Sequence, residues 1–513
     1  MGDAFRKSAG LNASEQRLTA LGEATFLRLW SYANVHVGRN RKGKIIGKEL
    51  ADLLVVCGEH VIVFSDKHIS WPATNDENLN WCRWYRKSVH ESAEQLRKAA
   101  RWIKEFPDSL YLDSKCTQKL PVDLPDLSIV KVHGVLIASG ASEACRNHYN
   151  GGSGSLSISS DLRDDEHTKI EDNHTRPFCI GDVNSSGPFL HVFNQTNIEL
   201  LVHELNTITD FVEYLSSREK LLRSRHTVYA AGEEDLLSFY LQTEDEIGNH
   251  DFIRNNANEI TRYDSIAIEE GFWRSYVARP EYVAKKKEEE QSYIWDRIID
   301  KFALHVLQGT APAIRGQTPE VRLAERALRI MALESRVHRR GLSQALVAAM
   351  LNSIDNKAAR FARFMFSDLN EHAASQAYIF LILAYDTGVN SCSDYEDYRH
   401  SRIGLLEAYC FGLLLKYPNL KVVVGLAFDA DESVTGRKGG SEDLMAVEQS
   451  DWTDDDKRRI QAIVDGLEIL HESRQTRGVI STVEYPQIMP KYANRQQRRA
   501  AERALKKAQK RSR

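Results

Sequence analysis

The apolar positions of the first hundred or so residues follow two kinds of spacing. Residues 14–33 repeat apolar side chains every three or four positions, which predicts an amphipathic helix. Two short apolar runs follow, residues 50–57 and 61–64, separated by a three-residue turn that contains glycine. This arrangement predicts an antiparallel hairpin. A second helical pattern covers residues 80–105 and stops before Pro107, a residue that ends helices.

The rest of the chain changes pattern several times. Short β-like runs at 109–112 and 128–138 complete a small α/β unit with the first helices. Residues 292–417 look almost wholly helical, and the apolar run 421–428 predicts a buried strand. The sequence thus predicts an α/β (α+β) protein in five parts: an N-terminal domain (1–146), a Gly- and Ser-rich flexible linker or insertion (147–176), a middle α/β domain (177–290), a mostly helical C-terminal domain (291–480) and a basic tail (481–513).

Composition narrows the classes of protein that this chain can be. The net charge of -4 over 513 residues provides no global attraction to nucleic acid, so any such binding must use local basic surface. No apolar run approaches the roughly 20 residues of a membrane helix, and the N-terminus lacks an apolar signal core. The seven cysteines are scattered, with no C-x-x-C pair. We therefore expect a cytoplasmic protein with free thiols that does not enter membranes.

Two charged residues stand at the ends of the predicted hairpin strands. Asp52 opens the run Asp-Leu-Leu-Val-Val, and Lys67 closes the run Val-Ile-Val-Phe-Ser-Asp-Lys. Strand alternation places Ser65 and Lys67 on one face and Asp66 on the other. Metal-dependent phosphodiester cleavage needs carboxylates that hold a cation, and a nearby lysine that adds positive charge. The alternative is that both charges simply reach solvent where the strands end.

These residues, together with two on the flanking helices, resemble the PD-(D/E)xK nuclease superfamily, especially its nuclease-related and resolvase-like branches. The resemblance covers about residues 15–112 and rests on the order Glu23, Asp52, Lys67, Gln95. It implies a restriction-endonuclease-like mixed sheet flanked by helices. It also implies that Glu23 and Asp52 bind Mg²⁺ or Mn²⁺, that Lys67 positions water or phosphate, and that Gln95 orients the substrate.

One position departs from the superfamily pattern. The second acid should stand two residues before the lysine, and here that residue is Ser65, a weaker ligand for Mg²⁺ than a carboxylate. Glu23, Glu49 or Asp66 could supply the missing carboxylate, so the expected metal ligands are Glu23, Asp52 and Asp66. We therefore expect a metal-dependent nuclease acting on DNA or RNA, in defence or nucleic-acid processing. The alternative is a catalytically inactive domain of the same fold that binds nucleic acid or serves as an interaction scaffold.

Basic residues near this constellation are candidates for contacts to nucleic acid, DNA more than RNA. One group lies in the loop before the hairpin, and another begins the long helix, where it interleaves with aromatic residues that can stack bases or instead pack under the sheet. The tail 494–513 holds nine Lys or Arg, either a solvated helix or an anchor for phosphates. The helical region offers surface for a homo-oligomer or a protein partner. The candidate contacts are Arg39, Arg41, Lys42 and Lys44, then Arg83, Arg86 and Lys87.

Overall fold

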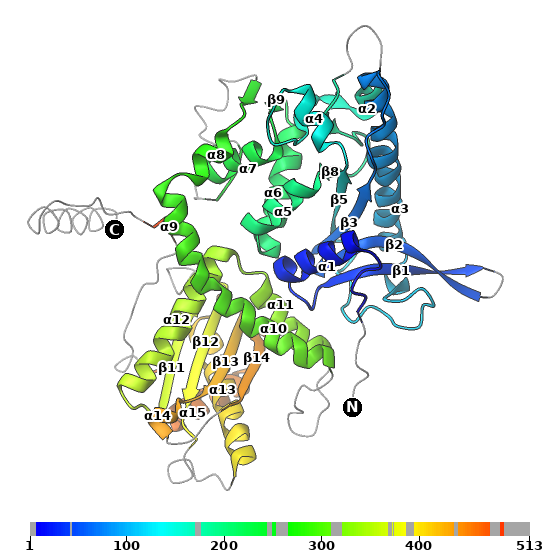
Figure 1. Cartoon of the computed structure of the whole chain (residues 1–513). Coiled ribbons are helices and arrows are strands. Elements are labelled where there is room, and N and C mark those ends of the chain that lie inside the picture. The colour runs from blue at the N-terminus through cyan, green and yellow to red at the C-terminus, as the bar shows by residue number, and fades with distance from the viewer. Residues whose placement is uncertain are drawn as a thin grey trace, which may run out of the picture.

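The structure, a computed structural model, describes most of the chain and arranges it around three sheets (Figure 1). None of the helices within the described ranges combines the length and apolar character needed to cross a membrane. The described residues are 7–41, 44–169, 176–243, 249–252, 265–308, 321–367, 372, 374–385, 394–435, 440–471 and 483–486.

The N-terminal sheet has six strands in the order β4-β1-β2-β3-β5-β8. The predicted hairpin is confirmed, because β2 and β3 pair antiparallel and turn at Gly58, whose φ of 60° suits glycine. Strands β3, β5 and β8 are parallel to one another, so the sheet is mixed. The strands are β1 (Ser31–Arg41), β2 (Lys44–Cys57), β3 (His60–His68), β4 (Leu110–Tyr111), β5 (Lys131–Ser139) and β8 (Leu190–Phe193).

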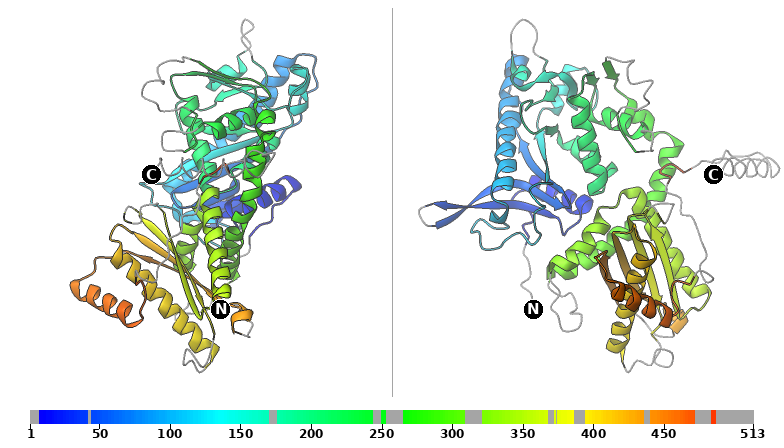
Figure 2. Two further views of the ribbon diagram at one scale, coloured as in Figure 1. Left: turned by 90° about the vertical axis from the view of Figure 1, so that its left-hand side faces the viewer. Right: turned by 180° about the vertical axis from the view of Figure 1, so that it is seen from behind.

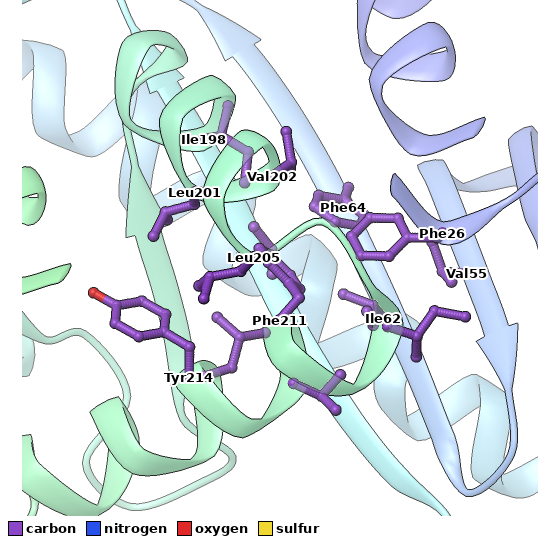
Figure 3. Close-up of a cluster of buried hydrophobic side chains, with 14 of the residues drawn as sticks. Phe26, Val55, Ile62, Phe64, Ile198, Leu201, Val202, Leu205, Phe211 and Tyr214 are labelled. Atoms are coloured by element: carbon purple, nitrogen blue, oxygen red, sulfur yellow. The ribbon is translucent and has the colours of Figure 1, made fainter. Parts of the chain in front are cut away.

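Helices cover both faces of this sheet. The long helix predicted for 80–105 forms as one run, α2 (Glu77–Tyr85), the π-turn η1 (Arg86–His90) and α3 (Glu91–Glu105), and packs against β3 and β5. The opposite face is covered by α1 (Ala13–Phe26), α5 (Gln195–Glu204) and α6 (Ile208–Leu222). In Figure 3, the rings of Phe64 of β3, Phe26 and Phe211 pack against one another; the ring centroid of Phe64 lies 5.9 Å from that of Phe26 and 6.4 Å from that of Phe211.

The middle region is joined to the N-terminal sheet more closely than the sequence suggested. Strand β8 completes that sheet, and residues 157–163, within the stretch expected to be a flexible linker or insertion, form strand β6. The residues of β6 are mostly buried, because the strand lies between β9 and β7 inside a second sheet, β10-β9-β6-β7. The strands of this second sheet and the helices of the middle region are α4 (Ser142–His148), β6 (Ser157–Arg163), η3 (Asp164–Thr168), β7 (Cys179–Asp182), β9 (Thr227–Ala230), α7 (Glu233–Gln242), β10 (Ser265–Ile268), α8 (Phe272–Val277) and α9 (Pro280–Glu289).

The C-terminal region is helical around a small four-stranded sheet, β11-β12-β13-β14. The strand predicted at 421–428 is β13, while β11 and β12 interrupt the run expected to be helical. Helices α10–α12 lie on one face of this sheet, and α13 and α15 lie on the other (Figure 2). The elements are η4 (Glu290–Ser292), α10 (Tyr293–Gln308), α11 (Val321–Ala332), α12 (Arg336–Asp355), β11 (Arg360–Phe366), β12 (Gln376–Leu383), α13 (Tyr395–Lys416), β13 (Val422–Asp429), α14 (Glu432–Thr435), β14 (Glu442–Glu448) and α15 (Asp454–Gly466).

Buried arginines join the C-terminal region to the rest of the molecule. Arg336 and Arg339, at the start of α12, bind the two carboxylate oxygens of Asp296 on α10 at 2.7 and 2.6 Å. Arg336 also donates to the side chain and the carbonyl of Asn206, between α5 and α6, at 2.6 Å each. A planar guanidinium with several satisfied donors fixes the orientation of its neighbours, so α12 is held against the helices of the N-terminal sheet.

Candidate functional site

A cavity of about 350 Å³ opens between the β2–β3 hairpin and α3. Leu96, Ala99 and Trp102 of α3 form its apolar wall, and strands β1, β2 and β3 supply most of the remainder. Three of the four residues that carried the sequence resemblance line it, as does the serine that replaces the expected acid. The polar residues around the cavity are Lys48, Glu49, Asp52, Ser65, Lys67, Gln95 and Lys98.

The hairpin register explains why Asp52 and Lys67 meet. Leu53 pairs with Phe64 across the two strands, so the next pair outward is Asp52 and Ser65, and Lys67 follows two residues later on the same face. The apolar side chains on the other face of these two strands, such as Val55, Ile62 and Phe64, point into the hydrophobic core shown in Figure 3. The expected alternation of β3 is therefore present, with Ser65 and Lys67 toward α3 and Phe64 toward α1.

Asp52 is partly buried, and its carboxylate is only partly compensated. Its Oδ2 accepts a hydrogen bond from the backbone N–H of Asp66 at 2.6 Å. Burial is the main effect on its pKa, which rises to about 6 although the Asp66 bond and the charge of Lys67 act to lower it. The nearby acids Glu49 and Asp66 add to the increase. A carboxyl group raised in this way, in a cavity beside a lysine, is a common feature of functional sites.

The expected metal ligand Asp66 faces away from the cavity. Its side chain accepts a hydrogen bond from Ser14 Oγ, just inside α1, on the opposite face of the sheet. Burial raises its pKa, with the Ser14 bond acting in the other direction. Asp66 therefore reaches Asp52 through its backbone N–H, and its carboxylate does not line the cavity.

Glu23, the other expected carboxylate, also lies outside the cavity. Its Oε1 binds Lys7 Nζ at 2.7 Å, and its Oε2 lies 3.8 Å from Arg28 Nε. The helix that carries it, α1, covers the face of the sheet opposite to α3. The structure therefore brings Asp52, Lys67 and Gln95 together but places Glu23 in a separate group of ion pairs.

Glu49, one of the acids that the sequence offered for the missing carboxylate, lines the cavity, and Lys98 is a cavity residue that the sequence analysis did not name. Glu49 lies just beyond a register irregularity of the β1–β2 pair, and its Oε1 accepts from Asn34 Nδ2 at 3.2 Å. Lys98 stands three residues after Gln95, which is one helical turn and hence the same face of α3. The helical spacing could have identified Lys98, whereas a β-bulge leaves no clear mark in one sequence.

The basic residues at the start of the long helix are separate from the cavity. Arg83, Arg86 and Lys87 are exposed, while the aromatic residues between them, Trp81 and Trp84, are fully buried. Trp81 donates through its indole N–H to the carbonyl of His167 at 2.7 Å. These aromatic residues therefore pack inside the protein, and the cations face solvent, which is the second of the two expected alternatives.

The other basic group follows the β1–β2 hairpin, which extends beyond the body of the molecule in Figure 1. Val37 pairs with Lys48, and both line the cavity. Further out, Arg39 pairs with Ile46 and Arg41 with Lys44. The paired strands β1 and β2 thus lead without interruption from the cavity to the backbone positions of these basic residues. Lys42 and the basic stretch 494–513 lie outside the described residues.

The donor set of the cavity is compatible with a hard divalent cation. Asp52 and Glu49 offer carboxylate oxygens, and Gln95 and Ser65 offer neutral oxygens. Mg²⁺ is often held by one or two carboxylates, with water and substrate phosphate completing its shell. Within the part of the chain that the structure describes, no group of three or more His, Cys, Asp or Glu side chains is placed to hold a metal ion.

A larger hollow of about 690 Å³ lies at the carboxyl ends of β3 and β5. Glu77 and Glu143 line it together with His68 and with neutral amides and hydroxyls, and Glu77 lies 2.8 Å from His148 Nδ1; its described lining holds neither lysine nor arginine. Two carboxylates repel a phosphate group, so this hollow suits an anionic nucleic acid less well than the cavity at Asp52.

The chain matches no protein-family model, no curated protein and no solved structure. The resemblance to PD-(D/E)xK nucleases therefore rests on the order of residues in the sequence.

Proposed function

We propose that the protein is a metal-dependent nuclease that acts on DNA or RNA through the cavity at Asp52. The observation that supports this proposal is the convergence of Asp52, Lys67 and Gln95 on one cavity of about 350 Å³. Their order along the chain led to the resemblance, and three separate elements bring them together.

Each residue has a distinct role in the proposed site. The carboxylate of Asp52, with Glu49 as the second acid, would hold Mg²⁺ or Mn²⁺. A cation bound there supplies the charge that activates water and stabilises the transition state of phosphodiester cleavage. Lys67 would place its ammonium beside the scissile phosphate, and Gln95 would orient the substrate by hydrogen bonding. Lys48 and Lys98 would attract the neighbouring phosphates.

The second candidate function is a catalytically inactive domain that binds nucleic acid or a protein partner. The observation that favours it is Ser65, because this buried hydroxyl occupies the position of the second acid. With Glu23 and Asp66 directed elsewhere, the cavity holds at most two carboxylates, Asp52 and Glu49. Such a site would retain the attraction of its lysines for phosphate without cleaving it.

Cleavage of a mixture of DNA and RNA, single- and double-stranded, distinguishes the two functions. We expect the wild-type protein to cut at least one substrate with Mg²⁺ or Mn²⁺ and to be inactive with a chelator. Asp52→Ala should abolish cutting, and Asp161→Ala, which removes an exposed acid of β6, should not. Binding without cutting under every metal condition would favour the inactive domain. The absence of both would reject the nuclease and the nucleic-acid-binding domain and would leave the domain that binds a protein partner.

A further inference from the structure

A short C-terminal segment, residues 483–486, is held by partners that are distant in sequence (red, beside α9 in Figure 1). Glu484 is central to this contact. Its Oε1 lies 2.5 Å from Lys285 Nζ on α9, and its Oε2 lies 2.6 Å from His250 Nε2. Lys285 is buried, so the carboxylate neutralises a cation that has little access to water.

The next residue, Tyr485, extends the contact toward α7 and α8. Its hydroxyl lies 2.7 Å from the hydroxyl of Tyr276 and donates to the carbonyl of Leu241 at 3.0 Å. The ammonium of Lys285 lies 5.3 Å from the centre of the Tyr485 ring, within the range of a cation–π contact.

The backbone of the segment is bound as well. Arg340 of α12 donates to the carbonyls of Val483 and Glu484, the latter at 3.2 Å. The segment thus contacts α7, α8 and α9 on one side and α12 on the other. It connects the middle region with the helices of the C-terminal sheet.

The chemistry of this pocket is complementary to an acidic residue followed by a tyrosine. Burial would raise the pKa of Glu484, but the charge of Lys285 and the bond from His250 lower it to about 2. Most of the contacts are polar: Val483 remains 59% exposed, and Tyr485, which packs against the hydrophobic core, is partly buried. Contacts of this kind can open without unfolding the core around them.

We propose that the pocket formed by Lys285, His250, Tyr276 and Arg340 is a docking site for a Glu-Tyr segment, and that residues 483–486 of the same chain occupy it as a detachable latch. This proposal is independent of the nuclease function. Docking fixes the point from which the chain continues toward its Lys- and Arg-rich sequence at 494–513. Release of the latch would free this attachment point and would expose Lys285.

Acylation of lysines in the full chain, measured by mass spectrometry, tests the latch. In the wild type, Lys285 should react about tenfold more slowly than Lys287, an exposed lysine on the same helix. Glu484→Gln should increase labelling of Lys285 toward that of Lys287. The control Glu290→Gln, which alters an exposed acid nearby, should leave the ratio unchanged.

A synthetic peptide of residues 480–489 separates docking from loss of structure. Added in excess to the Glu484→Gln chain, it should restore protection of Lys285, whereas the same peptide with glutamine at position 484 should not. An unchanged circular dichroism spectrum and an unchanged unfolding midpoint would show that the variant is folded. The proposal is overturned if Lys285 stays protected in Glu484→Gln, or if the peptide fails to protect the exposed lysine.

Discussion

The N-terminal and C-terminal sheets each hold partly or fully buried aspartates on their strands, but they compensate the charge differently. At the Asp52 cavity, one carboxylate accepts a backbone hydrogen bond and its pKa is raised to about 6, first because it is buried. In the C-terminal sheet, Asp429 and Asp443 surround the fully buried Arg402, which binds both of them.

Further donors complete the C-terminal cluster. Asp429 accepts hydrogen bonds from the hydroxyls of Tyr395 and Tyr398 at 2.5 and 2.8 Å, and Arg399 binds Asp443 at 2.5 Å. Burial opposes ionisation of Asp429, but these donors and Arg402 lower its pKa overall. A carboxylate satisfied on all sides stabilises a fold, whereas one that is desolvated beside an open cavity remains available for a ligand. This contrast is our physical reason for placing chemistry at Asp52.

The largest effect on stability is expected from Arg402→Leu. Removing the cation leaves Asp429 and Asp443 buried without their main partner, which should lower the free energy of unfolding by about 3–5 kcal/mol. Urea denaturation at pH 7 measures this loss. The defect should shrink as the pH falls toward 4, because protonated carboxyls need no cation. A variant as stable as the wild type at pH 7 would show that the cluster is not a structural ion pair.

The largest effect on catalysis without loss of stability is expected from Lys67→Ala. Lys67 is only partly buried at the cavity wall, so its removal should leave the unfolding midpoint nearly unchanged. Loss of its charge beside the phosphate should slow cleavage on the order of 100-fold. Lys287→Ala, which removes an exposed lysine of α9, is the matched control. Equal cleavage by both variants would remove Lys67 from the proposed site.

The raised pKa of Asp52 predicts a dependence of cleavage on pH. A carboxyl group with a pKa of about 6 is mainly protonated below that pH, and the proposed site needs the ionised form. At limiting Mg²⁺, kcat/KM should therefore fall about tenfold per pH unit below 6 and level off above it. The same shift means that the folded state disfavours the ionised form. As the pH rises from about 4 to about 6, Asp52 therefore lowers the free energy of unfolding. A rate independent of pH from 5 to 8 would contradict this assignment.

A smaller effect should identify the second carboxylate. Glu49→Gln removes a negative charge from the cavity and should reduce cleavage about tenfold at low Mg²⁺, with partial recovery at high Mg²⁺. Glu23→Gln alters an acid that binds Lys7 and Arg28 instead, and its rate should stay within about twofold of the wild type. A large loss of cleavage in Glu23→Gln together with little loss in Glu49→Gln would show that Glu23, and not Glu49, is the second acid of the site.

The positions of Asp52, Ser65 and Lys67 around one cavity follow from local periodicity. Two apolar runs joined by a short turn specify an antiparallel pair, and alternation then places Lys67 on the face of Ser65. Gln95 reaches the same cavity because the helix α3, which carries it, packs across the sheet. Glu23 differs, because its direction is set by Lys7 and Arg28, whose proximity is a tertiary contact.

The parts of the fold that were missed depend on contacts between distant segments. Strand β8 is four residues long and joins β5 from beyond the expected boundary at 146. The serine-rich strand β6 looks like a linker by composition and is buried only because β7 and β9 pair with it. Short strands are specified mainly by their neighbours, so a single sequence predicts them poorly.

The most direct test of the contrast between the two sheets is Asp52→Asn, measured for cleavage and for unfolding on the same preparation. Asparagine keeps an oxygen that can accept the Asp66 hydrogen bond but removes the desolvated charge. We predict a single-turnover rate at least about 100-fold below the wild type, with a free energy of unfolding that is unchanged or higher. A rate close to that of the wild type, or a rate loss explained by an equal loss of folded protein, would contradict the placement of the active site at Asp52.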